Sequence, residues 1–217
     1  MKLTDNSLGG YVNGVQPIPE FVPPANRPVT STPDVGILHT HPYIQGRGVP
    51  VEVAQEFGIG VYNNRVLFPV HDLYGNFVHY VPRVMDNTDP KYDFSGLAKS
   101  MHVYNYHRAR QARRKALIIV EGFIDTVKVH MAGYPSVVAL MGSAMSASQE
   151  SYILRWWEYI ILMMDGDKSG REAQEEHYKR FKKQDLKGLF KINLPDKVQP
   201  DQLNTDQIRQ ALSSPVQ

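Results

Sequence analysis

The sequence predicts an α/β protein built on a parallel sheet, and three observations support this class. Two apolar runs, residues 116–120 and 160–164, lack the polar alternation of a half-exposed strand, which indicates strands buried on both faces. Each run ends in carboxylates: Glu121 follows the first, and Asp165 and Asp167 follow the second. The stretch between the two runs contains helix-like segments, as expected when helices connect parallel strands.

The carboxylates at the two strand ends form the candidate site. Parallel strands bring their carboxyl ends to one edge, which is where open α/β sheets bind ligands. Three carboxylates repel one another unless a cation lies between them, and hard oxygen ligands suit Mg²⁺ or Mn²⁺ rather than zinc. An Asp-Gly-Asp sequence alone is also an ordinary turn, and it is the Glu-Gly-Phe-Ile-Asp motif at 121–125 that favours the metal site. Gly166 is expected to let the chain turn tightly between two ligands.

Composition sets the broad class of the protein. A chain of 217 residues with 42% hydrophobic and 21% charged residues is ordinary globular material. It has no bilayer-spanning apolar run and no signal pattern, so we expect a soluble, cytoplasmic protein that does not bind membranes. Zero cysteines exclude disulfides and cysteine-based zinc sites within the chain. A net charge of +2 is too small to indicate nucleic-acid binding by itself.

The N-terminal part changes character at about residue 44. Residues 1–43 are rich in proline and lack apolar periodicity, which predicts an extended arm or linker. Residues 51–57 form a short amphipathic pattern between a proline and a glycine, typical of a helix. Two strand-like runs follow, 65–72 and 77–81, joined by a Gly-Asn turn.

A helix is predicted from Lys99 to Arg114, leading into the first buried strand. It carries a basic cluster interleaved with aromatic residues, and this pattern fits either a nucleic-acid face or a solvated helix. The cluster consists of Arg108, Arg110, Arg113, Arg114 and Lys115.

The C-terminal part is predicted to continue the alternation of helices and strands. After Glu121 we expect a helix to about residue 132, a strand over 136–140, a helix over 146–157, a helix after Gly170 and a fourth strand over 189–193. Asp125 lies one helical turn beyond Glu121, so it can reach or orient the metal site. Gly142 and Ser143 occupy a loop at the same edge, where free backbone N–H groups can contact a phosphate.

Three motifs resemble the TOPRIM domain shared by topoisomerases, DnaG-type primases and some nucleases. They are Val120-Glu-Gly-Phe-Ile-Asp125, Leu140-Met-Gly-Ser-Ala144 and Met164-Asp-Gly-Asp-Lys-Ser-Gly-Arg171. The preceding segment resembles the N-terminal half of a DnaG-type primase core, with Phe57-Gly-Ile-Gly60, Arg65-Val-Leu-Phe-Pro-Val-His-Asp72, Arg83 and Pro90-Lys-Tyr92. The resemblance covers roughly residues 46 to 203.

The resemblance implies a set of phosphate-binding and metal-binding residues. In the family, basic residues of the N-terminal half hold template and nascent-strand phosphates, and the positions that carry over are Arg65, Arg83, Lys91 and Lys99. His71 stands where the family usually has an arginine. Near the C-terminus the family has Asp-Pro-Asp, with both aspartates close to the metals; this chain keeps Asp201 but has Gln199 instead of the first. A neutral amide should hold a second cation more weakly.

The resemblance implies a DNA primase-like core that makes RNA primers on single-stranded DNA. We expect an arm (1–43), a mixed α+β primase subdomain (44–115), a TOPRIM domain (116–195) and an acidic loop with a helical tail (196–217). Glu121, Asp165 and Asp167 are the expected catalytic metal ligands, supported by Asp125 and Asp201. The alternatives are a TOPRIM nuclease and a non-catalytic nucleic-acid-binding or regulatory protein.

The expected partners are a single-stranded template, NTPs and a further replication protein. DnaG-type primases usually carry a zinc ribbon and a helicase-docking domain, and neither is expected within this chain. A separate zinc-binding protein or the replicative helicase is therefore the expected partner. The small size suggests a phage or mobile element as the source.

Overall fold

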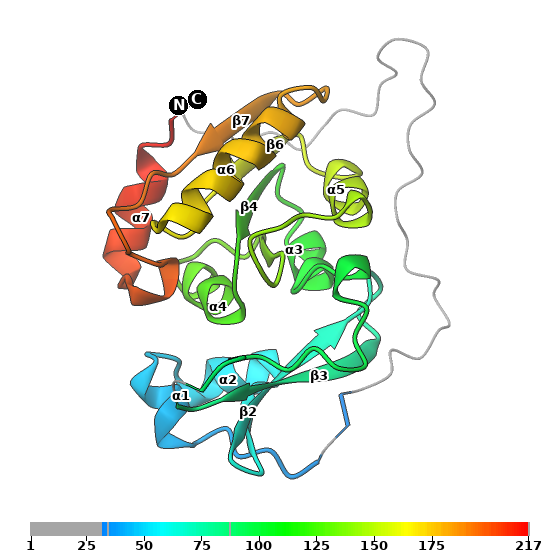
Figure 1. Cartoon of the computed structure of the whole chain (residues 1–217), viewed down its shortest axis with the longest axis vertical. Coiled ribbons are helices and arrows are strands. Elements are labelled where there is room, and N and C mark those ends of the chain that lie inside the picture. Colours follow the sequence, from blue (N-terminus) through cyan, green and yellow to red (C-terminus); the bar gives the residue numbers. More distant parts are fainter. Residues whose placement is uncertain (1–31, 34, 87, 217) are drawn as a thin grey trace.

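Two β-sheets organise the chain, a small antiparallel sheet from the N-terminal half and a parallel sheet from the C-terminal half (Figure 1). The computed structural model describes residues 32–33, 35–86 and 88–216. Within these, the strand order is β1-β2-β3 in the first sheet and β5-β4-β6-β7 in the second. Every pair in the second sheet is parallel. The predicted α/β class with a parallel sheet is confirmed.

The N-terminal subdomain packs two short helices beside its sheet. Its elements are α1 (Pro42–Gly46), α2 (Val51–Phe57), β1 (Gly60–Tyr62), β2 (Arg65–His71) and β3 (Phe77–Val84). Helix α2 ends at a left-handed glycine (φ 68°), as the sequence predicts. The predicted strands are present as β2 and β3, whereas β1 was not predicted because three residues are too few to show a periodicity.

The predicted arm lies mostly outside the described residues, since 1–31 and 34 are among those not described. The described end of it lies against the small sheet. Leu38 bridges to Val61 of β1, and the His39 ring nitrogen lies 2.7 Å from the carbonyl oxygen of Ile59. Helix α1 begins before the expected end of the arm, with His41 accepting a hydrogen bond at its N-cap.

The C-terminal subdomain alternates strands and helices around the parallel sheet. Its elements, in chain order, are β4 (Ala116–Val120), α4 (Phe123–Met131), β5 (Val137–Ala139), α5 (Ala147–Leu154), β6 (Tyr159–Leu162), α6 (Lys168–Phe181), β7 (Gly188–Lys191), η2 (Pro200–Gln202) and α7 (Thr205–Ser213). None of the helices in the described part of the chain is long and apolar enough to cross a membrane.

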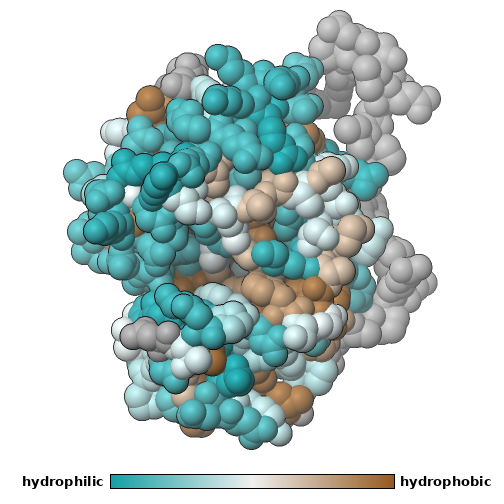
Figure 2. Space-filling model, viewed as in Figure 1, coloured by the Kyte–Doolittle hydropathy of each residue, from teal (hydrophilic) through white to brown (hydrophobic). Residues whose placement is uncertain are grey.

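Strand β4 is buried on both faces, which explains its unbroken apolar run. Ile118 and Val120 belong to the core shared with the N-terminal sheet, and Leu117 and Ile119 belong to the core on the opposite face. Phe123, at the start of α4, stacks on Phe68 of β2 with ring centroids 4.7 Å apart. The two subdomains therefore share one hydrophobic core, and apolar surface gathers between the two halves in Figure 2.

The helix predicted over residues 99–114 is wrong. The structure has a short 3-10 helix η1 (Lys99–Met101), an extended stretch, and α3 (Tyr106–Gln111). Tyr104 pairs with Ala139 through two backbone hydrogen bonds of 3.0 and 3.2 Å. Asn105 adopts a left-handed conformation and donates a side-chain hydrogen bond to the carbonyl of Val137. These contacts with the edge strand β5 outweigh the local helical preference.

Two histidines pack against each other between the hairpin and α3, and they make stability depend on pH. The ring centroids of His71 and His107 lie 4.7 Å apart. Burial, with the charge of Arg108 adding to it, lowers the pKa of His71 to about 4 and that of His107 to about 3. The unfolded chain, with a histidine pKa near 6.5, then binds more protons below that pH. This contribution to stability is complete above about pH 6.5 and declines as the pH falls toward 4.

We expect His107→Gln to lose part of this acid sensitivity. Each buried neutral histidine makes the free energy of unfolding about 2 kcal/mol lower at pH 5 than at neutral pH. Urea unfolding at pH 7.5 and pH 5.0 should therefore show a smaller drop for the variant than for the wild type, by about that amount. The carboxylates titrate alike in both proteins and cancel in this comparison. Equal drops would mean that His107 is charged or accessible in the folded state.

Candidate active site

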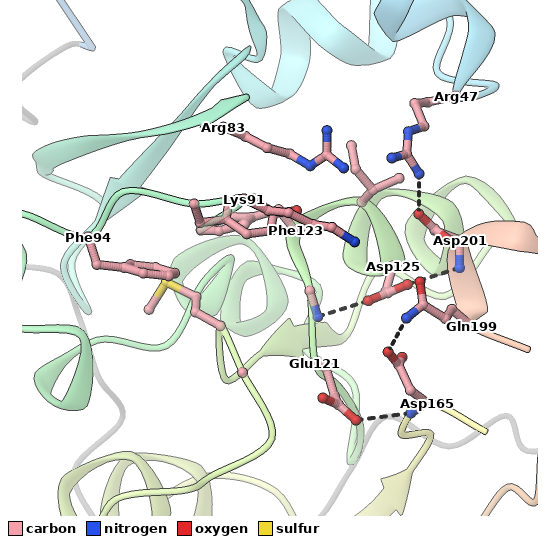
Figure 3. Close-up of a pocket in the computed structure, with 15 residues that line it drawn as sticks. Arg47, Arg83, Lys91, Phe94, Glu121, Phe123, Asp125, Asp165, Gln199 and Asp201 are labelled. Carbon is pink, nitrogen blue, oxygen red and sulfur yellow. Dashed lines mark hydrogen bonds and ion pairs between the residues drawn. The ribbon is translucent and has the colours of Figure 1, made fainter. Parts of the chain in front are cut away.

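The ends of two neighbouring parallel strands build the centre of the site. Glu121 follows β4 directly, and Asp165 follows β6 after two further residues. The carboxylate Oε1 of Glu121 accepts a hydrogen bond of 3.1 Å from the backbone N–H of Asp165 (Figure 3). The structure thus brings these two predicted residues together at one edge of the sheet.

Asp125 ties the C-terminal loop to this edge. It lies in the first turn of α4 and is only 7% exposed. Its two oxygens accept from the backbone N–H groups of Gly122 (2.8 Å) and Asp201 (2.9 Å). Asp201 in turn forms an ion pair of 2.9 Å with Arg47 of the N-terminal subdomain. Asp125 therefore holds η2 against the start of α4 through hydrogen bonds.

Asp165 lies where negative charge is least compensated. Its Oδ2 accepts from the Gln199 amide at 2.6 Å, whereas its Oδ1 is buried and has no hydrogen-bond partner among the described residues. Burial, with the negative charges of Asp125 and Glu121 adding to it, raises the pKa of Asp165 to about 8. Burial also raises the pKa of Asp125 to about 7 and that of Glu121 above its ordinary value. These carboxylates therefore disfavour one another's charged forms.

Asp167 is placed differently from the other carboxylates. It is the N-cap of α6, and its Oδ1 accepts a 2.8 Å hydrogen bond from the backbone N–H of Gly170. It does not line the pocket that contains Glu121 and Asp165. Its charge still contributes to the raised pKa of both. A role as direct ligand remains a prediction, and its visible role is to begin α6 beside the strand ends.

A basic wall faces the carboxylates across the same pocket. Arg83 of β3 is 7% exposed, and its guanidinium lies 5.5 Å from the ring centroids of both Tyr43 and Tyr92. It also donates hydrogen bonds to the Tyr43 hydroxyl and to a backbone carbonyl, which fix its direction. Lys91 is exposed and lines the same pocket. Figure 3 shows Arg47, Arg83 and Lys91 on the side opposite Glu121 and Asp165.

Of the remaining predicted residues, some lie at this pocket and others lie outside it. Lys99 lies over the Phe94 ring at 5.0 Å and close to Gly142, which lines the pocket. The expectation that Gly142 offers a free N–H is wrong, because this group donates to the carbonyl of Glu121 at 3.1 Å. The carbonyl of Ser143 accepts a hydrogen bond from the His177 ring. Arg65 is exposed at the start of β2 and does not line this pocket.

Comparison with known proteins places this geometry in a family. A model of the Toprim domain matches residues 115–188. DNA primases of Staphylococcus aureus (strain COL) and Staphylococcus epidermidis are 32% and 30% identical over 179 and 178 residues, covering 75% and 74% of this chain. The chain spans about 30% of the length of these curated relatives.

Solved structures agree with the sequence match. A DnaG primase catalytic domain bound to ssDNA superposes with a TM-score of 0.70 at 24% identity, covering 82% of this chain and 72% of that one. The Escherichia coli primase catalytic core gives 0.69 at 23% identity, covering 82% and 73%. The chain has a DnaG-type TOPRIM core.

The TOPRIM core offers oxygen donors that fit a divalent cation at Glu121 and Asp165. The buried Oδ1 of Asp165 has no hydrogen-bond partner among the described residues, and neighbouring carboxylates add to the burial that raises its pKa, so a bound cation would suit this position. In the part of the chain that the structure describes, no three acidic or histidine side chains converge tightly enough to ligate one ion. Asp125 is occupied by backbone N–H groups and Asp167 by its helix cap. Substrate oxygens or water would therefore complete the shell.

Sequence reasoning missed several residues of the TOPRIM core's pocket. Arg47 is not among the predicted site residues, because its partner Asp201 lies 154 positions away and no local sequence pattern indicates the pair. Tyr43 was assigned to the arm, although it holds Arg83 in place. Phe94 lies among polar residues and carried no signal, yet it lines the pocket.

Proposed function

We propose that this chain is the catalytic core of a DNA primase that joins ribonucleotides on a single-stranded DNA template. The observation that carries the proposal is a single pocket in which TOPRIM carboxylates face Arg83 and Lys91. Acidic and basic side chains that line one pocket suit a nucleoside triphosphate, whose phosphates need both metal cations and charge-assisted hydrogen bonds. The primase relatives and the DnaG domain bound to ssDNA support the same choice of substrate class.

The residues take distinct roles in this proposal. Glu121 and Asp165 hold Mg²⁺ or Mn²⁺, with Asp167, Asp125 and Asp201 supporting them. When bound, such ions would stabilise the negative charge of the pyrophosphate, which leaves as the bond between the α-phosphorus and the β-phosphate breaks and the primer 3′-oxygen bonds to the α-phosphorus.

The basic wall positions the phosphates. Arg83 is held between two tyrosine rings, so its guanidinium is aimed before the substrate arrives. Lys91 supplies a mobile charge at the mouth of the pocket, and Lys99 another beside Gly142. The exposed Arg65 is proposed to contact the template strand outside this pocket.

Recognition of a start sequence is proposed to need a further component. Lysine and arginine side chains that bind phosphates position a strand without reading its bases. We therefore propose that a zinc-bearing protein or domain, or the replicative helicase, directs the core to its start sites in the cytoplasm.

The proposal is tested by incubating the protein with labelled NTPs, Mg²⁺ or Mn²⁺ and a single-stranded template carrying a short annealed RNA primer. Template-dependent extension of the primer is expected. Cleavage of the strand would instead indicate a nuclease, and binding without either reaction would indicate a non-catalytic protein. Either result would overturn the proposal.

Residue 199 allows a specific prediction about the cations. Gln199→Asp replaces the amide that donates to Asp165 with an anionic ligand. We expect tighter Mn²⁺ binding, by about tenfold or more, together with a lower melting temperature without metal because a further carboxylate joins the cluster. Calorimetric titration and thermal melts of both proteins measure the two effects. Unchanged affinity and stability would show that residue 199 does not act on the metal site.

A further inference from the structure

A second basic surface lies at the opposite edge of the parallel sheet. Lys115 immediately precedes β4, whereas Glu121 immediately follows it. In the same way Trp156 and Glu158 precede β6, and Asp165 follows it. A strand of five residues is about 17 Å long, so this surface and the proposed active site are separate.

A groove marks this edge, and its lining is cationic and aromatic. It is formed by the β2–β3 turn, by α3 and by the segments that precede β4 and β6. Its positive side chains are Arg110, Arg113, Arg114 and Lys115. Its one acidic residue, Glu158, already forms ion pairs with Lys187 (2.9 Å) and Lys115 (3.9 Å). Positive charge therefore dominates the groove.

The aromatic residues of the groove present ring surface beside this charge. Tyr74 is 47% exposed at the tip of the β2–β3 turn. Trp156 is half-buried, and the Arg110 guanidinium lies over its ring at 3.2 Å from the centroid. The neighbouring Trp157 has another role, because it is buried and its indole N–H donates to Ser136. The two tryptophans therefore have different roles: Trp157 packs in the core, and Trp156 lines the groove.

The backbone at Arg113 shows that the position is not optimised for stability. Arg113 has a left-handed φ of 49°, a conformation in which glycine costs less than any other residue. Its side chain is exposed in the groove, so packing does not explain an arginine there. A strained residue of this kind is commonly retained for a binding role.

We propose that this groove is a second binding site for single-stranded nucleic acid, distinct from the pocket where nucleotides are joined. Positive side chains along a groove follow the phosphate backbone, and adjacent aromatic and arginine planes stack on unpaired bases. An acidic protein would match the charge but would not need the exposed ring of Tyr74. Binding in this groove does not require the proposed polymerase activity. If the chain acts as the proposed primase, the groove holds the single strand at a distance from the reacting primer end.

The test compares two matched double variants in strand binding without NTPs or divalent metal. Arg113→Gly with Arg114→Ala removes two groove charges, and the glycine also removes the left-handed strain, so the fold is retained or gains melting temperature. Lys182→Ala with Lys183→Ala removes two exposed charges that do not line the groove. Each protein is titrated with fluorescent oligonucleotides of 8 and 30 nucleotides over a range of salt concentrations.

We expect the groove variant to bind the 30-nucleotide strand about tenfold more weakly. Its slope of log K against log salt should fall by about 1.4, as for two lost contacts at about 0.7 each. The Lys182/Lys183 variant should bind like the wild type. Equal losses of affinity in both variants would overturn the proposal. No loss of affinity in the groove variant would also overturn it, and this is the result expected if the groove binds an acidic protein instead.

A second readout separates this inference from the proposed function. In a Glu121→Gln background the groove variant should lose the same factor in binding, because the groove lies at the other sheet edge. Failure of primer extension would then count against the proposed function alone. A Tyr74→Ala variant, which leaves charge unchanged, should lower affinity for the 30-nucleotide strand by several-fold. Unchanged affinity there would contradict the stacking part of the inference.

Discussion

Replacing Asp165 by Asn should lower the rate of ribonucleotide incorporation by at least about 100-fold while raising the melting temperature in the absence of metal. The neutral amide keeps an oxygen that can accept from Gln199, so the loop contact is retained. What is lost is the charge that burial and neighbouring carboxylates already penalise, as the raised pKa of Asp165 shows. Primer extension and a thermal melt in EDTA measure the two effects.

The control for this prediction is Asp196→Asn. Asp196 is exposed, pairs with Arg171 at 3.3 Å and does not line the pocket. We expect it to change neither activity nor melting temperature appreciably, because exposed ion pairs contribute little. A large drop in the melting temperature of Asp165→Asn would mean that Asp165 is a structural residue. Retained activity would remove it from the proposed mechanism.

Gly166→Ala should destabilise the protein by about 3 kcal/mol or more and abolish activity. A Cβ at residue 166 would clash with the carbonyl oxygen of Pro195 and lie 2.9 Å from that of Val198. The Gly166 N–H also donates to the Val198 carbonyl at 2.8 Å. Since these are backbone atoms, the alanine must displace the loop that carries Gln199. Urea unfolding and primer extension measure the outcome.

Gly46→Ala is the matched control, because a Cβ there meets nothing within 4 Å and its φ is not left-handed. It should leave stability and activity close to wild type. If Gly166→Ala is equally harmless, the loop is not docked on the Asp-Gly-Asp turn as described.

Much of the fold could be predicted because its signals are local. The buried run of β4 indicated a parallel strand that ends at Glu121, and the structure confirms the strand and its parallel pairing. The Gly58 stop of α2 was equally local. The chain bends at Gly166, where a tight turn was predicted, but without a left-handed φ; what requires glycine there is the close approach of the Pro195 carbonyl.

The rest depends on contacts between distant segments. The break in the predicted helix at Asn105 arises from its bond to Val137, which no local pattern reveals. The pairing of Arg47 with Asp201 joins two segments that lie 154 positions apart in the sequence. Asp167 is an exception, because its position directly before α6 is a local signal for the helix cap that the structure shows.

We propose that one pocket joins a metal-holding carboxylate cluster to a phosphate-holding basic wall. Mn²⁺ binding followed by electron paramagnetic resonance, with and without NTP, tests both halves together. We predict that NTP tightens Mn²⁺ binding to the wild type. Arg83→Lys should weaken that NTP effect yet leave binding of Mn²⁺ alone unchanged, because lysine cannot stack between Tyr43 and Tyr92 as arginine does. Asp165→Asn should lose Mn²⁺ with and without NTP. Wild-type Mn²⁺ affinity in the Asp165→Asn protein would show that Asp165 does not hold the metal.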